Sequence, residues 1–154
     1  VAAAICKHHP EVKSLRDANY ELLDEVRGEV SKEDALRAHY VIGEKERVME
    51  VSAALEKEDY EEVGKKMYET HDGLSREYEV SCPELDFLVD VARDCGVSGA
   101  RVMGGGFGGC TINLVSQELY ANFIDKARKS YQEKFGKAPI VIDVVIGDGA
   151  RKLC

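Results

Sequence analysis

The sequence has few of the features that mark several large protein classes. It contains no tryptophan, three prolines and no long hydrophobic run, whereas a membrane-spanning helix needs about 20 consecutive apolar residues. Its 21 basic residues are outnumbered by 29 acidic ones, for a net charge of -8. We therefore expect neither a membrane protein nor a general basic field for nucleic acid. The first methionine is Met49, and we expect the chain to be a processed product or a piece of a longer protein.

The five cysteines lack the pattern of a disulfide framework or a zinc site. Their number is odd and no C-x-x-C pair occurs, whereas both kinds of site use paired cysteines at regular spacing. No leader with a charged start, an apolar stretch and a cleavage site is visible. We expect a reducing, cytoplasmic protein in which Cys82, Cys95 and Cys110 are small buried side chains rather than nucleophiles.

The length and composition suit one globular domain whose first half is helical. The chain has 154 residues, 44% of them hydrophobic, which is the size of a typical single domain. An apolar start predicts a helix that ends before Pro10, and residues 15–30 are compatible with a loop or a short helix. Further helices are predicted from capping residues and 3.6-residue periodicity. The first begins at Ser31 and runs to about Lys57, with one apolar face formed by Val41, Val48, Val51 and Leu55. The second follows Asp59, and the third follows a capping box of Ser81 and Glu84 and ends at Gly96.

The second half of the chain predicts strands and one more helix. Residues 100–103 and 111–115 have the pattern of short strands on either side of a glycine-rich loop. Ser116 can cap a helix that Gly136 ends. Residues 140–146 form a nearly continuous β-branched run, which is typical of a strand buried on both faces. This order predicts an α+β fold in which helices cover a small antiparallel or mixed sheet.

The glycine-rich loop is the strongest local feature of the sequence. Glycines let backbone amides approach an anion closely and adopt positive φ angles. The loop matches G-x-G-x-x-G, but a strand-like segment follows it where a dinucleotide site needs a helix. It also fails the phosphate-loop pattern G-x-x-x-x-G-K-[ST], because Cys110 stands in place of the lysine. A strand-to-strand turn with glycines chosen for tight packing stays open beside an anion-binding role. The candidate site residues are Gly104, Gly105, Gly106, Phe107, Gly108 and Gly109.

Two blocks of sequence extend this feature into a family resemblance. Residues 98–111 read Ser-Gly-Ala-Arg-Val-Met-Gly-Gly-Gly-Phe-Gly-Gly-Cys-Thr, and residues 71–86 end in Glu-Val-Ser-Cys-Pro-Glu-Leu-Asp. The first block closely resembles the third, C-terminal motif of the GHMP small-molecule kinases in its galactokinase form, and the second resembles another galactokinase stretch. Weaker similarities lie at residues 37–41 and 147–151.

The resemblance implies a ferredoxin-like C-terminal domain of a two-domain kinase. Kinases of this family use ATP and Mg²⁺ to phosphorylate a small alcohol, which is the anomeric hydroxyl of galactose for galactokinases. The active site lies in the cleft between the domains. The sugar-binding motif Gly-Glu-His-Thr-Asp and the phosphate loop ending in Leu-Ser-Ser-Ser-Ala are absent from this sequence. The resemblance therefore implies that residues 1–154 are a single C-terminal domain, and that the N-terminal catalytic domain is its missing partner.

The roles expected for individual residues follow from this division. The loop 104–109 would offer backbone donors near the phosphates or the sugar at the domain interface, with Phe107 anchoring it by packing. We expect no catalytic residue, no metal ligand and no tightly bound cofactor in this chain, and no activity from it alone. Asp86 is expected in the first turn of a helix and Arg101 in a surface or ion-pair role. His39 and His71 are expected to be packed or hydrogen-bonded histidines.

Three other functions stay open at this point. One alternative is that the whole two-domain protein is a galactokinase-like regulator, which senses sugar without catalysis. A second is that it is a kinase for a related sugar such as N-acetylgalactosamine. A third alternative is that the chain is a stand-alone interaction domain. The motifs that separate these functions lie outside the sequence.

Overall fold

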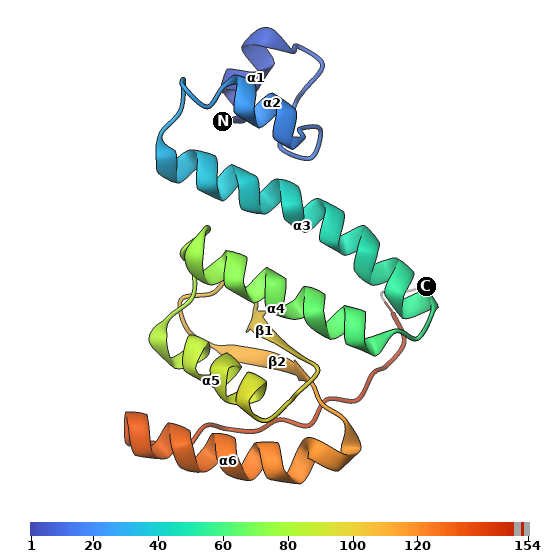
Figure 1. Cartoon of the computed structure of the whole chain (residues 1–154), viewed down its shortest axis with the longest axis vertical. Helices are drawn as coiled ribbons and strands as arrows, with labels where there is room; N and C mark the ends of the chain where they lie inside the picture. The colour runs from blue at the N-terminus through green and yellow to red at the C-terminus, as the bar shows by residue number, and fades with distance from the viewer. Residues whose placement is uncertain (150–151, 153–154) are drawn as a thin grey trace.

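The structure is a computed structural model that describes residues 1–149 and 152. Figure 1 shows α1 and α2 side by side at the N-terminal end, α3 crossing below them, and the remaining elements layered beneath α3. The arrangement confirms the predicted α+β class, with helices packed around a small antiparallel sheet. In chain order the elements are α1 (Ala2–His8), α2 (Tyr20–Glu25), α3 (Lys32–Glu56), α4 (Tyr60–Arg76), α5 (Pro83–Asp94), β1 (Gly99–Met103), β2 (Cys110–Leu114) and α6 (Gln117–Phe135).

Side-chain hydrogen bonds cap the first turns of α2, α3 and α4, whereas Ser116 stands at the N-cap of α6 without a hydrogen bond from its side chain. The Ser31 hydroxyl accepts the Asp34 amide at 3.0 Å, and the Asp59 carboxylate accepts the Glu62 amide at 3.1 Å, as predicted. Asn19 caps α2 by accepting the Leu22 amide, which settles the open choice for residues 15–30 in favour of a short helix. Each cap satisfies an amide that the first turn of a helix leaves without a partner.

The capping box predicted at Ser81 is wrong by one position. Pro83 is the first residue of α5, so the N-cap is Cys82. Proline favours this first helical position because its missing amide would have no partner there. Ser81 therefore lies outside the helix, and its hydroxyl donates to the Asp86 carboxylate instead.

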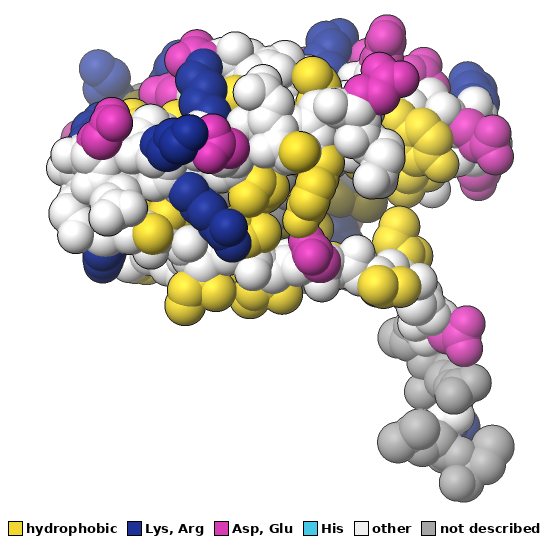
Figure 2. Space-filling model, turned by 90° about the horizontal axis from the view of Figure 1, so that it is seen from below, with side chains coloured by type: hydrophobic (Ala, Val, Ile, Leu, Met, Phe, Trp, Pro, Cys, Tyr) yellow, Lys and Arg dark blue, Asp and Glu magenta, His cyan; other side chains and the backbone are white. Residues whose placement is uncertain are grey.

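The sheet has two strands, and the strand predicted at residues 140–146 is absent. β1 and β2 pair antiparallel from Gly99 opposite Leu114 to Met103 opposite Cys110. Residues 140–146 form no ladder, and Ile146 is 96% exposed instead of buried. A β-branched run favours extended backbone, but a strand also needs a neighbour for its amides and carbonyls. Figure 2 shows the described part of this segment leaving the body of the molecule, where no strand of residues 1–149 pairs with it.

Two separate clusters form the hydrophobic core. One joins α1, α2 and α3 around Ile5 and Ile42, which are fully buried. The other joins α5, β1 and α6 around Val89, Ala100 and Phe123. Among the helices of the described chain, none combines the length and the apolarity that crossing a membrane requires.

The apolar face predicted on α3 is helical but not buried. Val48 is 65% exposed and Leu55 is 50% exposed. The buried positions of the helix lie elsewhere, at Ala35, Ala38, Tyr40, Ile42, Gly43 and Ala54. The spacing of apolar residues therefore located the helix correctly but gave the wrong side for its contacts.

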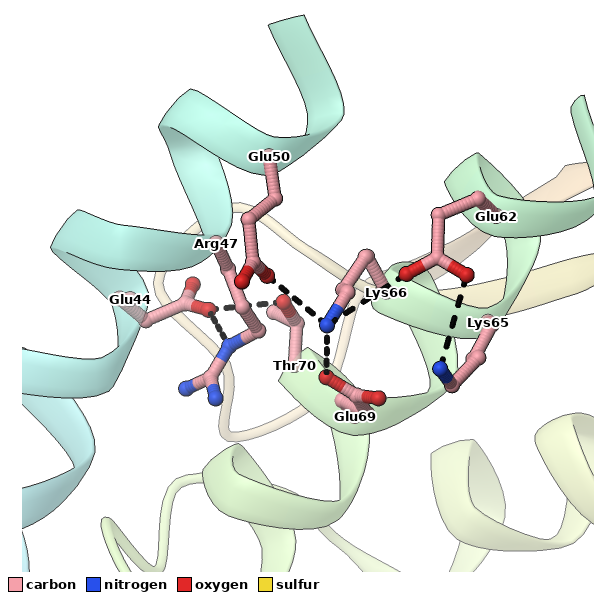
Figure 3. A network of polar contacts seen from close by, with 8 residues as sticks. All are labelled: Glu44, Arg47, Glu50, Glu62, Lys65, Lys66, Glu69 and Thr70. Carbon is pink, nitrogen blue, oxygen red and sulfur yellow. Dashed lines mark hydrogen bonds and ion pairs between the residues drawn. The ribbon is translucent and has the colours of Figure 1, made fainter. Parts of the chain in front are cut away.

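A network of charged and polar side chains links α3 to α4 (Figure 3). The Lys66 ammonium of α4 lies 2.8 Å from Glu50 of α3, and 3.1 and 3.6 Å from Glu69 and Glu62 of its own helix. The side chain of Lys66 is 13% exposed, and its carboxylate partners raise its pKa above the usual range, the Glu50 hydrogen bond most. Next to it, Glu44 accepts hydrogen bonds from Arg47 at 2.6 Å and Thr70 at 2.7 Å.

On its other side, α4 approaches the start of β1 without any side chain between them. A Cβ atom on Gly64 would lie 2.0 Å from the Ser98 carbonyl oxygen, and one on Gly99 would lie 2.4 Å from the Gly64 Cα. Glycine at both positions allows this contact, which sets the distance between the helix and the strand that leads into the glycine-rich loop.

Candidate functional site

The predicted glycine loop connects the paired ends of β1 and β2. Its backbone lies mostly in the left-handed region, with φ of +80° at Gly104, +81° at Gly106, +126° at Gly108 and +92° at Gly109. Phe107 has a φ of +58°, which is rare for a bulky side chain and costs free energy. The loop therefore holds a conformation that the rest of the protein must stabilise.

The contacts of each glycine separate the two explanations that the sequence left open. A Cβ atom on Gly106 would lie 2.2 Å from the Val80 carbonyl oxygen, so tight packing explains this glycine. Gly104, Gly108 and Gly109 face open space and are explained by their positive φ. Gly105 has neither a positive φ nor an atom within 4 Å of its Cβ position among the described residues. Packing within the described chain therefore does not account for Gly105, and its surface is free to be approached.

The loop is anchored by the backbone of Phe107 and not, as expected, by its ring. The Phe107 amide donates to the Val80 carbonyl at 2.7 Å, whereas the residue is 77% exposed. A solvated ring contributes little packing energy, because little of its surface leaves water. The prediction of a packed Phe107 is wrong, and the hydrogen bond to Val80 takes over the anchoring role.

Val80 belongs to the segment 77–82, which connects α4 to α5 and is held at both ends. At its start, the Glu77 amide donates to the Gly73 carbonyl at 3.0 Å, and further along the Val80 amide donates to the Leu74 carbonyl at 2.9 Å. At its end, the Asp86 carboxylate accepts the Ser81 hydroxyl on one oxygen and the Ser75 hydroxyl, at 3.0 Å, on the other. Asp86 lies in the first turn of α5, as expected.

The side chains of His39, His71 and Arg101 contact other groups of the protein, as expected for residues with structural roles. His71 is 3% exposed, and burial lowers its pKa although the Asp86 carboxylate, 3.3 Å from Nε2, opposes that change. Its Nδ1 has no hydrogen-bond partner among the described residues. His39 is exposed and lies 2.7 Å from Glu77. Arg101 donates to the Val102 carbonyl at 3.0 Å, so its guanidinium is engaged by its own strand.

A cavity of about 620 Å³ opens beside the loop between α5 and the segment after α6. Most of its lining is apolar, with one cation, Lys137, and one carboxylate, Glu84. Lys137 is not part of any motif, and no sequence pattern predicts its position beside the loop. Cys82 and Cys110 also line the cavity. Cys110 is exposed and Cys82 is half-buried, so the prediction that they are buried small side chains is wrong for Cys110.

The chemistry of the loop suits anions and not metal ions. Backbone amides are hydrogen-bond donors that match phosphate oxygens, whereas Mg²⁺ takes oxygen ligands. Across residues 1–149 and 152, no group of three or more His, Cys, Asp or Glu side chains is arranged to hold a metal ion. Of the remaining predicted features, Cys154 and the end of the similarity at 147–151, Ala150 and Arg151, lie outside the described residues.

Comparison with known proteins gives the family. The family model described as GHMP kinases C terminal matches residues 51–133, more than half of the chain. Human galactokinase is 43% identical over 143 residues, which are 92% of this chain and 36% of that protein. Galactokinase of Thermotoga maritima is 38% identical over 144 residues, 93% of this chain and 40% of that protein.

A solved structure agrees with the sequence matches. The crystal structure of Lactococcus lactis galactokinase complexed with galactose superposes with a TM-score of 0.80 at 27% identity, covering 89% of this chain and 36% of that one. The chain thus spans 36–40% of the length of these relatives. Since the family model covers the glycine loop, α4, α5 and most of α6, the chain belongs to the GHMP kinases and carries their C-terminal region.

Proposed function

We propose that this chain is the C-terminal domain of a galactokinase. In the reaction of the whole protein, the anomeric hydroxyl oxygen of galactose forms a bond to the γ-phosphorus of ATP. The bond from that phosphorus to the bridging oxygen breaks, and ADP leaves. The names of the two galactokinases compared above support this choice of substrate. One structural observation carries the role of the chain, namely a glycine loop whose Gly105 is explained neither by packing nor by backbone conformation within the described residues.

The proposed contribution of the chain is to position backbone donors. Phosphoryl transfer depends mainly on the placement of the reacting groups and on electrostatic stabilisation of the phosphates. The amide of Phe107 is committed to Val80 and fixes the loop, so that the glycine amides around it hold one arrangement toward the phosphates. Preorganised amides need no rearrangement as charge develops on the phosphate oxygens.

The remaining parts of the reaction are assigned outside this chain. We propose that residues 1–154 pack against an N-terminal domain of the same protein, that ATP and galactose bind between the two, and that the protein works in the cytoplasm. The base that takes the galactose hydroxyl proton belongs to that other domain. Mg²⁺ accompanies ATP, and we place its ligands on the ATP phosphates and on the rest of the protein.

The test is an assay of the intact protein and of residues 1–154 alone. With ATP, Mg²⁺ and galactose, we expect the intact protein to form galactose 1-phosphate and ADP, and the chain alone to give background only. N-acetylgalactosamine is assayed in parallel. If the protein phosphorylates it much better than galactose, N-acetylgalactosamine is the substrate. Binding of galactose and ATP by the intact protein without turnover would contradict the kinase and identify a sugar-sensing regulator.

A glycine pair tests the role of the loop in the same assay. Gly105 and Gly28 both face open space, and neither has a positive φ, so alanine at either site leaves the fold unstrained. We expect Gly105→Ala to lower kcat/KM for ATP about tenfold, which is a loss of about 1.4 kcal/mol of transition-state stabilisation. Gly28→Ala is the control and should change it less than about twofold. Equal activity of the two variants would show that the loop does not contact the nucleotide.

A further inference from the structure

Asp86 joins three parts of the structure that meet behind the glycine loop. It belongs to α5, and its carboxylate accepts the hydroxyl of Ser75 from α4 and that of Ser81 from the connecting segment 77–82. His71 of α4 lies 3.3 Å away. Hydrogen bonds to a charged acceptor are stronger than those between neutral groups. The carboxylate therefore ties the segment to both helices that flank it.

The segment needs such an anchor because its own backbone is strained. Glu79, in its middle, has a φ of +58°, a conformation that is unfavourable for a residue with a side chain. Val80, the next residue, is held on its amide side by Leu74. On its carbonyl side, Val80 is followed by Ser81, whose hydroxyl is held by the Asp86 carboxylate.

The position of the Val80 carbonyl in turn fixes the loop. It accepts the Phe107 amide at 2.7 Å, and it lies so close to Gly106 that a Cβ there would be 2.2 Å from it. The Phe107 residue itself has a φ of +58°, so the loop relies on this contact to stay in its conformation. A displacement of Val80 is passed directly to the amides on either side of Phe107.

We propose that Asp86 is a positioning residue for the glycine loop, acting through Ser81 and the Val80 carbonyl. The structural link stands on the contacts above. Its consequence for catalysis rests on the proposed function, in which the loop faces the phosphates of ATP. Asp86 does not touch the substrates in this proposal, and its role is to keep the loop donors in one arrangement.

The first experiment measures the loop directly, by hydrogen exchange of the peptide amides at 104–109 in the intact protein. Ser81→Ala removes the hydroxyl, and we expect the Phe107 amide to exchange at least about tenfold faster, since a hydrogen bond to a charged group is lost. Ser81→Thr restores the hydroxyl and should restore slow exchange. Ser130→Ala is the control, because this hydroxyl bonds to the Lys126 carbonyl within α6. If the Phe107 amide in Ser81→Ala exchanges within twofold of its rate in the unsubstituted protein, the proposal is overturned.

A double-mutant cycle tests whether Asp86 and Ser81 act together. Asp86→Ala should accelerate exchange at Phe107 as well, and adding Ser81→Ala to it should have no further effect, because the contact is already absent. Independent, multiplying effects would show that the two residues do not act through one another. If Asp86→Ala does not fold, the Ser81 variants still decide the question on their own.

The second experiment follows the catalytic consequence. In the intact protein, Ser81→Ala should raise the KM for ATP about tenfold and leave the KM for galactose within about twofold, with recovery in Ser81→Thr. Faster exchange with unchanged kinetics for ATP would overturn the positioning role. If the parent protein does not phosphorylate galactose at all, the proposed function fails, while the exchange experiment still decides whether Asp86 holds the loop.

Discussion

The contact between Gly64 and Ser98 gives a prediction in which two principles oppose each other. In the middle of a helix, Gly→Ala normally stabilises a protein by about 1 kcal/mol. Gly64 lies inside α4, so helix propensity alone predicts a gain for Gly64→Ala. The new Cβ, however, would lie 2.0 Å from the Ser98 carbonyl oxygen and 2.4 Å from its carbon. Both atoms belong to the backbone, which cannot turn aside as a flexible side chain would.

The magnitude follows from the displacement that this clash requires. To bring the contact to about 3 Å, α4 must move roughly 1 Å away from β1, and a gap of that size forfeits a quarter to a half of each van der Waals attraction across the contact. Overpacking costs about 1–3 kcal/mol and more where backbone blocks relaxation. Against the gain in helix propensity, we expect a net loss of about 2 kcal/mol.

The assay is urea unfolding followed by far-ultraviolet circular dichroism, because the chain has no tryptophan to report by fluorescence. With a slope of about 2 kcal/mol per M, the midpoint of Gly64→Ala should fall by about 1 M. Gly28→Ala, at an open site, should stay within about 0.3 M. Gly99→Ala places a Cβ atom in the same contact from the strand side, so its urea midpoint should fall as well. A midpoint for Gly64→Ala at or above that of the parent would refute the packing argument.

Three further predictions concern the loop, the charged network and the N-terminal helix. Gly106→Ala combines a φ of +81° with a clash against Val80, so we expect about 2–4 kcal/mol lower stability by urea unfolding. Lys66→Met leaves its carboxylate partners without their cation and should cost about 1–2 kcal/mol at low salt and less in 1 M NaCl. The side chain of Lys65 is 62% exposed, so Lys65→Met should cost much less in the same titration, and an equal loss would contradict the network. The hydrogen bond to Glu25 raises the pKa of His9 above 6.5. Its stabilising effect should therefore be complete below that pH and disappear as the pH rises through the raised pKa, as measured by comparing the stability of the parent and His9→Gln across this range; a constant difference would refute it.

Local signals in the sequence predicted most of the element ends. Ser31 and Asp59 mark helix starts by accepting an amide of the first turn. Gly96 and Gly136 mark helix ends with φ of +72° and +75°. These features depend on a few neighbouring residues, and that is why a single sequence contains the information for them.

The wrong predictions share a dependence on distant parts of the chain. The run at 140–146 has strand propensity, but a strand also requires a partner, which the described residues do not provide. Val48 has the correct helical spacing, but which side of α3 is covered depends on where α1, α2 and α4 pack. Hydrophobicity predicted a packed Phe107, but the surroundings of the loop leave the ring in water.

In the candidate site, too, local features are predictable from the sequence and contacts between distant residues are not. The glycine loop was visible because its residues are consecutive and because the motif resembles a known family. Asp86 was correctly placed in the first turn of a helix, but its contacts with Ser75 and Ser81 were not predicted. These partners come from α4 and from a connecting segment, and no periodicity relates them to the loop that they support. Lys137 likewise reaches the cavity only because the chain turns back after α6.

The exposed run at 140–146 has a practical consequence for handling this chain. Ile140, Ile142, Val144, Val145 and Ile146 are each at least 74% exposed, and extended β-branched segments with free backbone groups are templates for intermolecular cross-β association. The single charge inside the run is Asp143, which acts as a gatekeeper against such pairing. Production of the chain by itself thus favours self-association at high concentration, and Asp143→Asn should lower its solubility limit. Added carboxylates on the same run, as in Val145→Glu, should raise that limit without touching either hydrophobic cluster.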